Sequence, residues 1–190
     1  MKQSFEKNKK NQFYFLSILL IIGRFFDIIT TALFTPNLDR EANPVVSLLG
    51  ANWTIIILLQ ITFCAFIIYG LYLHFKIEMK QPTIPNLRFY EYISHLNFNN
   101  SNSFYKIFYT IPKNKTFFIA HTGFVLTQTL IISSFLVGLS TSFLLTSTSY
   151  RAFYNHGMVY FIYTGMIGLA IYFSIQFYRK SYHEYQLNNK

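Results

Sequence analysis

Charged residues and cysteine are scarce in this sequence. Only 12% of its 190 residues are charged, whereas a soluble domain carries roughly 25%. The single cysteine, Cys64, lies inside an apolar stretch. These shortages exclude a disulfide framework and a cysteine-based metal cluster, and they argue against a soluble globular enzyme.

Acidic residues are also few. Seven Asp and Glu stand against 16 Lys and Arg, which gives a net charge of +9. A basic balance can indicate nucleic-acid binding, but 52% of this chain is hydrophobic and 20% is aromatic. The apolar residues must be concentrated in blocks, because both ends of the chain and one long loop are polar. We therefore do not expect nucleic acid as a partner.

Four apolar blocks are long enough to cross a lipid bilayer. A transmembrane helix needs about 20 apolar residues to span a hydrocarbon core roughly 30 Å thick. Residues 13–35, 53–75, 117–146 and 152–178 meet that length. The sequence predicts an all-α integral membrane protein, with one membrane domain (13–178) made of four transmembrane helices in an antiparallel bundle.

The distribution of Lys and Arg predicts the orientation of this bundle, since positive loops stay on the cytoplasmic side. Residues 1–12 contain four of them, residues 76–116 contain six and residues 179–190 contain three. The two loops on the opposite side contain only Arg40 and Arg151. We expect a multi-pass protein of the plasma membrane, with the N-terminal basic tail (1–12) and the C-terminal tail (179–190) both cytoplasmic. The lipid bilayer and its anionic headgroups are the first expected partners.

The predicted cytoplasmic loop, residues 76–116, is long for a compact bundle. Leu87, Tyr90, Ile93 and Leu96 recur at near-helical spacing, with charged residues and a histidine on the other face. This pattern predicts an amphipathic interfacial segment between the second and third helices. The segment either covers the end of the bundle or offers a docking surface to a partner.

Two charged residues lie inside the first apolar block. Arg24 and Asp27 are three residues apart, and Thr31 is four further on, so all three share one face of a helix. Charges within a membrane are costly and normally face the bundle interior or water. Two interpretations follow: a neutral pair that fastens the first helix to its neighbours, or an outward-facing polar pocket.

Further polar residues are expected on the same outer side. Glu41 and Asn43 lie in the loop after the first helix, and His156 lies near the start of the fourth. Asn43 before Pro44 also fits a simple helix start, with Asn as the N-cap and Pro at the first helical position. The candidate pocket residues are therefore Arg24, Asp27, Thr31, Glu41, Asn43 and His156.

The chemistry of this candidate pocket is open. Two carboxylates and one imidazole (Asp27, Glu41 and His156) suit a hard or borderline divalent cation, or an acid and base pair. The sequence has no His-Glu-x-x-His, Gly-x-Ser-x-Gly, Walker or Cys-x-x-Cys motif. No catalytic residue or cofactor can be assigned, and the metal set is a hypothesis.

Small residues recur in the third and fourth blocks. Ser134, Gly138 and Ser142 are spaced by four residues, and Gly165 and Gly168 by three. Such spacing permits close approach of helix backbones. Packing within one chain is the first expectation, and formation of a homo-oligomer is the alternative.

The stretch Asp27-Ile-Ile-Thr-Thr31, followed ten positions later by Glu41-Ala-Asn-Pro44 and an apolar helix, resembles a family of small bacterial and archaeal membrane proteins of unknown function. In that family an Asp and a Thr late in the first helix precede a Glu-x-Asn-Pro motif, and a later helix carries a His. The resemblance covers about the first 75 residues and matches His156 only loosely. It implies a shared polar site without naming its chemistry. The long cytoplasmic loop and an additional helix distinguish this chain from the short members.

Three classes of function stay open from the sequence. A non-enzymatic membrane component that binds or scaffolds partners fits the lack of catalytic motifs and the aromatic loop. A small-solute or ion transporter fits the intramembrane pair Arg24 and Asp27. A membrane-embedded, hydrolase-like enzyme requires Asp27, Glu41 and His156 to lie around one reacting atom. The partner classes are a second membrane protein and a further copy of this chain.

Overall fold

The computed structural model describes residues 2–38, 50–77 and 81–188. Every regular element in these ranges is a helix. The helices include four that are long and apolar enough to cross a membrane, which confirms the predicted fold class at this level. The long helices are α1 (Lys2–Phe34), α3 (Trp53–Lys76), α5 (Lys115–Thr146) and α7 (Val159–Asn188).

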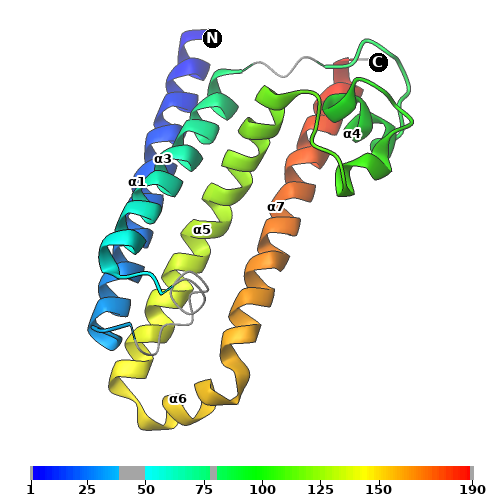
Figure 1. The fold of residues 1–190 in the computed structure, drawn as a ribbon. Helices are drawn as coiled ribbons and strands as arrows, with labels where there is room; N and C mark the ends of the chain where they lie inside the picture. Colours follow the sequence, from blue (N-terminus) through cyan, green and yellow to red (C-terminus); the bar gives the residue numbers. More distant parts are fainter. Residues whose placement is uncertain (1, 39–49, 78–80, 189–190) are drawn as a thin grey trace.

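Figure 1 shows these four helices side by side, with the chain reversing direction from each one to the next. Both termini lie at one end of the molecule, called the termini end below. The short helix α6 (Thr148–Phe153) lies at the opposite end, called the α6 end. Helix α5 contacts α1, α3 and α7, so it is the central element of the bundle.

Local sequence signals explain two of the helix starts. The Asn52 side chain accepts a hydrogen bond from the backbone N–H of Ile55 and caps α3. Asn114 caps α5 by accepting from the N–H of Phe117. An Asn at the N-cap satisfies one of the N–H groups that a helix start leaves without an intrahelical partner.

The fourth spanning segment is not the single helix predicted over residues 152–178. A π-helical turn, η2 (Tyr154–Met158), separates α6 from α7. Within it His156 has φ −84° and ψ 20°, and Gly157 has φ +102°. The left-handed φ at Gly157 is accessible because glycine has no Cβ. The break changes the helical phase, so His156 does not continue the face of α7.

Glycines bring α5 into direct contact with two neighbours. A Cβ built on Gly123 would lie 2.4 Å from the Cα of Gly70 on α3, and one on Gly138 would lie 2.4 Å from the Phe26 ring on α1. At Gly123 the neighbouring atoms are backbone, so a larger side chain there requires a shift of the helices, whereas at Gly138 the Phe26 ring would have to move. The small-residue stripe predicted on α5 is therefore used for packing within the chain.

The segment between α3 and α5 folds against the termini end of α7. It contains α4 (Phe89–Phe98) and a short 3₁₀ helix, η1 (Phe104–Phe108), and α4 contacts α7 and α5. Ile93 and Leu96 are buried there as their spacing predicts, but Tyr90 is 44% exposed and Tyr92 takes the buried position instead. The apolar face of α4 thus covers one end of the bundle.

Tyr92 connects α4 to α7 and to the loop before α4. Its hydroxyl bonds with Ser181 on α7 and donates to Gln81. Its ring packs against those of Tyr182 and Tyr185. Loss of solvent raises the pKa of Tyr92 to about 12, although the bonds to Ser181 and Gln81 oppose that rise.

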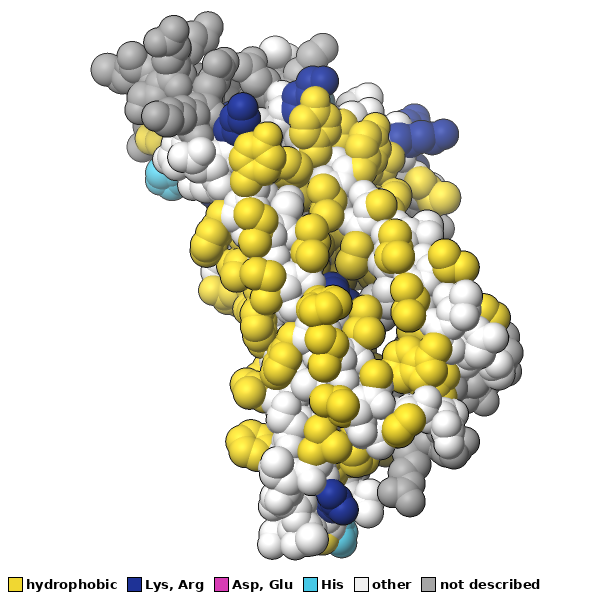
Figure 2. Space-filling model, turned by 90° about the vertical axis from the view of Figure 1, so that its left-hand side faces the viewer, with side chains coloured by type: hydrophobic (Ala, Val, Ile, Leu, Met, Phe, Trp, Pro, Cys, Tyr) yellow, Lys and Arg dark blue, Asp and Glu magenta, His cyan; other side chains and the backbone are white. Residues whose placement is uncertain are grey.

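Hydrophobic side chains cover the middle of the bundle surface, as expected for helices in contact with lipid. In Figure 2 they spread over the middle of one face, whereas Lys and Arg gather near its two ends. A basic side chain is also visible in a hollow at mid-height. The orientation with both termini in the cytoplasm stays a prediction.

Candidate functional site

Arg24 is the centre of a polar cluster in the middle of α1, α3 and α5. Its Nε donates to Oε1 of Gln60 on α3, and its Nη1 donates to Oγ of Ser134 on α5, both at 3.1 Å. Nη1 also lies 2.9 Å from Oδ2 of Asp27. The contacts of one guanidinium with three helices fit the predicted clasp between the first helix and its neighbours.

The same cluster faces a cavity of about 490 Å³, called the charged cavity below. Arg24, Asp27 and Thr31 line it from α1, and Gln60 lines it from α3. The side chains of Arg24 and Asp27 are only 15% and 13% exposed. The two interpretations of the pair, clasp and pocket, are therefore compatible in one arrangement.

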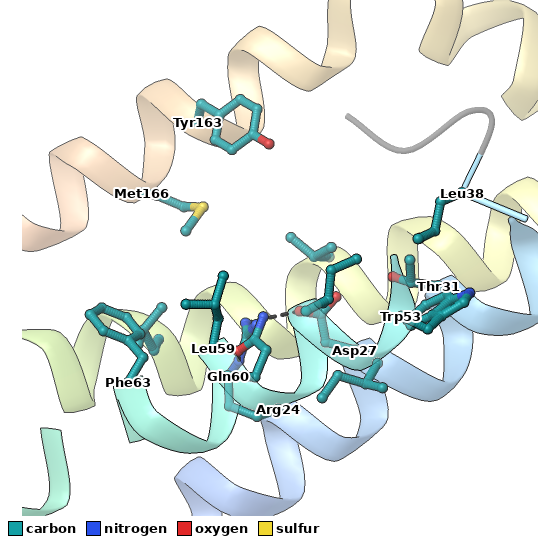
Figure 3. Close-up of a pocket in the computed structure, with 14 residues that line it drawn as sticks. Arg24, Asp27, Thr31, Leu38, Trp53, Leu59, Gln60, Phe63, Tyr163 and Met166 are labelled. Carbon is teal, nitrogen blue, oxygen red and sulfur yellow. Dashed lines mark hydrogen bonds and ion pairs between the residues drawn. The ribbon is translucent and has the colours of Figure 1, made fainter. Parts of the chain in front are cut away.

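Apolar and aromatic side chains form most of the remaining walls. Figure 3 shows Phe63 and Leu59 on one side of the charged pair, Trp53 and Leu38 on the other, and Met166 across from it. Tyr163 lies beside Met166 on α7, so α7 supplies the wall opposite α1 and α3. A few polar groups among apolar walls are typical of ligand sites.

The charged pair retains hydrogen-bonding capacity toward this space. Within the described ranges, no hydrogen bond occupies Nη2 of Arg24 or Oδ1 of Asp27. The guanidinium can donate from Nη2, and an ionised Asp27 can accept at Oδ1. The charged pair therefore offers the cavity a donor group and an acceptor group, whose positions are fixed by the contacts of Arg24.

The other predicted pocket residues do not all join this site. Glu41 and Asn43, together with Pro44, lie outside the described residues. His156 is exposed, its Nδ1 lies 2.6 Å from the carbonyl oxygen of Ala152, and it is not among the cavity-lining residues. Of the six candidates, the structure brings together Arg24, Asp27 and Thr31.

The metal hypothesis is not supported by the described part of the chain. There, no group of three His, Cys, Asp or Glu side chains is placed to hold a metal ion. Asp27 is the single acidic residue among the described residues that line the charged cavity. The set of Asp27, Glu41 and His156 stays a prediction, because Glu41 lies outside the described ranges.

Sequence reasoning missed three parts of this site. Ser134 was expected only as a small packing residue, yet its hydroxyl accepts from Arg24. Trp53, the one tryptophan of the chain, lines the cavity and donates to the carbonyl oxygen of Pro36. Met166 was not singled out. The uniqueness of Trp53, directly after the Asn52 cap, was the available signal.

A second cavity of about 650 Å³, the termini cavity, lies between α1 and α7 toward the termini end. Leu20, Ile67 and Leu130 form a buried cluster between the two cavities, called the apolar plug. Along α1, Leu16 lines the termini cavity, Leu20 belongs to the plug and Arg24 lines the charged cavity. These residues are spaced by four, so they share one helix face.

Comparisons of this chain with protein-family models, with curated proteins and with solved structures find no match. The resemblance based on Asp27, Thr31 and the Glu41-Ala-Asn-Pro44 motif therefore stays a prediction. Function has to be argued from the site.

Proposed function

We propose that the protein is a non-enzymatic membrane component that binds a membrane-resident amphiphile in the charged cavity. The observation that carries this proposal is the composition of the cavity, with Arg24 and Asp27 at one place among apolar walls. An amphiphile has a matching division into a polar head and an apolar tail.

The polar head of this partner is uncharged and carries both a donor and an acceptor, as an alcohol or an amide does. Arg24 and Asp27 neutralise each other across 2.9 Å. A ligand with a net charge would find no unpaired counter-ion among the described residues that line the charged cavity, and an unpaired charge inside a membrane costs several kcal/mol. A neutral head can accept from Arg24 and donate to Asp27 without that penalty.

The tail of the partner contacts the apolar walls. Leu59 and Phe63 on α3 and Met166 on α7 flank the charged pair. Tails of lipid type are as apolar as these side chains, so shape rather than hydrophobicity would select among them. With the positive-inside orientation, the cavity opens in the outer half of the membrane.

The geometry gives less support to the two other classes. A transporter needs a path between the two sides, and the apolar plug of Leu20, Ile67 and Leu130 closes the line between the two cavities. A hydrolase needs a second catalytic group beside Asp27, and His156 is not among the lining residues.

The sole tryptophan supplies a direct test. Trp53 lines the charged cavity, so its fluorescence reports on occupancy. In phosphatidylcholine nanodiscs we expect saturable quenching of Trp53 by ω-bromododecanol. The variant Arg24→Met with Asp27→Leu removes both polar groups and preserves the net charge, and it should weaken the quenching at least about tenfold.

The matched control is Gln128→Leu, which removes a polar group from the termini cavity instead. It should quench as the wild type does. The anionic probe ω-bromododecanoate should bind more weakly than the alcohol. Quenching that never saturates, or that is equal in all variants, reflects partition into the bilayer and contradicts the proposal.

A further inference from the structure

The termini cavity has a different chemistry from the charged cavity. Two lysines line it, Lys9 on α1 and Lys180 on α7, together with one acid, Glu184. The remaining polar residues among the described lining are uncharged and consist of amides, one hydroxyl and the His74 imidazole. Among these described residues lysine outnumbers acid by one, and the two lysines come from opposite ends of the chain.

Aromatic and apolar side chains form the deep part of this cavity. The ring of His74 lies 4.6 Å from that of Phe124 and 5.5 Å from that of Phe177, measured between centroids. Phe15 and Leu16 add an apolar wall from α1. The lining therefore changes from basic to apolar within one cavity.

The two lysines lie where the apolar segments end. Lys9 is one helical turn before Phe13, the first residue of the predicted membrane block. Lys180 is three residues after the buried Phe177. In a bilayer such lysines extend their aliphatic stems along the helix and place the ammonium at the level of the lipid phosphates.

We infer that the termini cavity is a binding site for the phosphate group of an anionic phospholipid. The phosphate accepts from Lys9 and Lys180, and an acyl chain follows Phe15 and Leu16 toward the plug. The carboxylate of Glu184 repels the phosphate and thereby limits the affinity for the lipid. The lipid would join α1 to α7 at the end of the bundle where α7 is already packed. This inference concerns residues that the charged cavity does not use, so it stands or falls separately from the proposed function.

The test compares phosphatidylglycerol with phosphatidylcholine. Purified protein in mild detergent is titrated with each lipid, and binding is measured by native mass spectrometry and by the thermal unfolding midpoint. We expect phosphatidylglycerol to bind the wild type more tightly and to raise the midpoint further. Lys9→Gln with Lys180→Gln should weaken its binding by about thirtyfold, which corresponds to two lysines near a membrane surface.

Lys113→Gln with Lys115→Gln is the matched control, since it removes the same charge from exposed positions at the start of α5. It should leave the preference for phosphatidylglycerol unchanged. Glu184→Gln should tighten binding, which keeps the test decisive if the double lysine variant fails to fold. Equal weakening by both lysine pairs, or no preference in the wild type, overturns the site. Equal stabilisation by inorganic phosphate overturns the lipid assignment and leaves a site for free phosphate.

Discussion

The two halves of α7 differ in sequence and in surroundings. Residues 159–173 are mostly apolar and contain no charged residue, whereas residues 174–188 include Arg179, Lys180 and Glu184. Toward the termini end, Tyr178, Ser181 and Tyr185 are at most 9% exposed. Toward the α6 end, Tyr160 is 77% exposed and Phe161 is 75% exposed. Figure 1 shows the half of α7 toward the α6 end standing apart from α1 and α3. The difference teaches that apolar side chains alone do not hold a helix to its neighbours, because contact with lipid tails is as favourable for them as contact with another helix.

Hydrogen bonds between elements distinguish the packed half. The Tyr185 hydroxyl accepts from the N–H of Leu87 and donates to the carbonyl oxygen of Ile84. Asn97 of α4 donates to the Tyr178 hydroxyl. These bonds satisfy buried polar groups and set the position of α7.

Glycine gives the same contrast between α5 and α7. Gly123 contacts the backbone of α3, whereas a Cβ on Gly165 or Gly168 would meet no atom within 4 Å. Within the described residues, the predicted close approach of another helix to α7 at these two glycines is therefore absent. The predictions below test this division between tightly and loosely packed regions, from the largest expected effect to the smallest.

The largest effect is expected at the charged pair of the packed region. Asp27→Asn leaves Arg24 as an uncompensated charge that is 15% exposed. The free energy of unfolding in mild detergent should fall by about 3 to 5 kcal/mol. Arg24→Met combined with Asp27→Leu should stay within about 1 kcal/mol of the wild type, since no charge is left alone. If the double variant lost as much stability as Asp27→Asn, an uncompensated charge could not be the cause of the loss, and the contacts of Arg24 with Gln60 and Ser134 would account for it.

The next largest effect is expected when a glycine is replaced by a larger residue. The loss of stability should be large in the tightly packed region and small in the loosely packed one. Gly123→Leu forces α5 away from Gly70, whose Cα lies 2.4 Å from the position of the added Cβ. We expect a loss of about 3 kcal/mol, at the upper end for overpacked sites. Gly165→Leu has open space and should change stability by less than about 0.5 kcal/mol. Denaturant titration of both variants measures the contrast, and equal losses would show that α7 packs more closely than described.

Removal of the Tyr185 hydroxyl should lower the stability of the packed half of α7. Tyr185→Phe keeps the ring but leaves the buried N–H of Leu87 without its acceptor. The expected loss is about 1 to 2 kcal/mol. Tyr160→Phe removes a hydroxyl from the exposed half and should have no measurable effect. If both variants match the wild type, the bonds from Tyr185 to Ile84 and Leu87, in the loop before α4, do not stabilise the fold.

The last prediction concerns the effect of Tyr92 on the pH dependence of stability. This effect is absent at neutral pH and is expected only above pH 10. Its pKa is about 12 in the folded protein, against about 10 in an unfolded chain. Because the folded pKa is the higher one, the contribution of Tyr92 is complete below pH 10 and is lost as the pH rises toward 12. The unfolding midpoints of wild type and Tyr92→Phe should therefore keep a constant difference up to pH 10. That difference should shift against the wild type above it, and a constant difference up to pH 12 would contradict the burial of the hydroxyl.

Much of the fold was predictable because its signals are local. The four spanning segments follow from apolar length, and the starts of α3 and α5 follow from Asn52 and Asn114. The helix between α3 and α5 follows from the spacing of Ile93 and Leu96. The choice of Tyr92 rather than Tyr90 for the buried position was not predictable, because it depends on Ser181 and Gln81, which are distant in sequence.

The candidate site was also only partly predictable from the sequence. Arg24, Asp27 and Thr31 share a face of α1 by spacing alone, and the structure gathers them in one cavity. His156 does not share the face of α7 that carries Tyr163, because Gly157, with its positive φ, breaks the helix between them. Tyr163 lines the charged cavity, but His156 does not.

By itself the sequence determined which segments are apolar enough to span a membrane, where the positive charges gather and which polar residues share the middle of α1. These features depend on composition and on helical periodicity, so they need no neighbour. Only the tertiary structure decided that Gly123 packs while Gly165 does not, and that Arg24 reaches Gln60 and Ser134. The physical reason is that helices in a bilayer associate through shape and hydrogen bonds between distant residues, and no single segment encodes its partner.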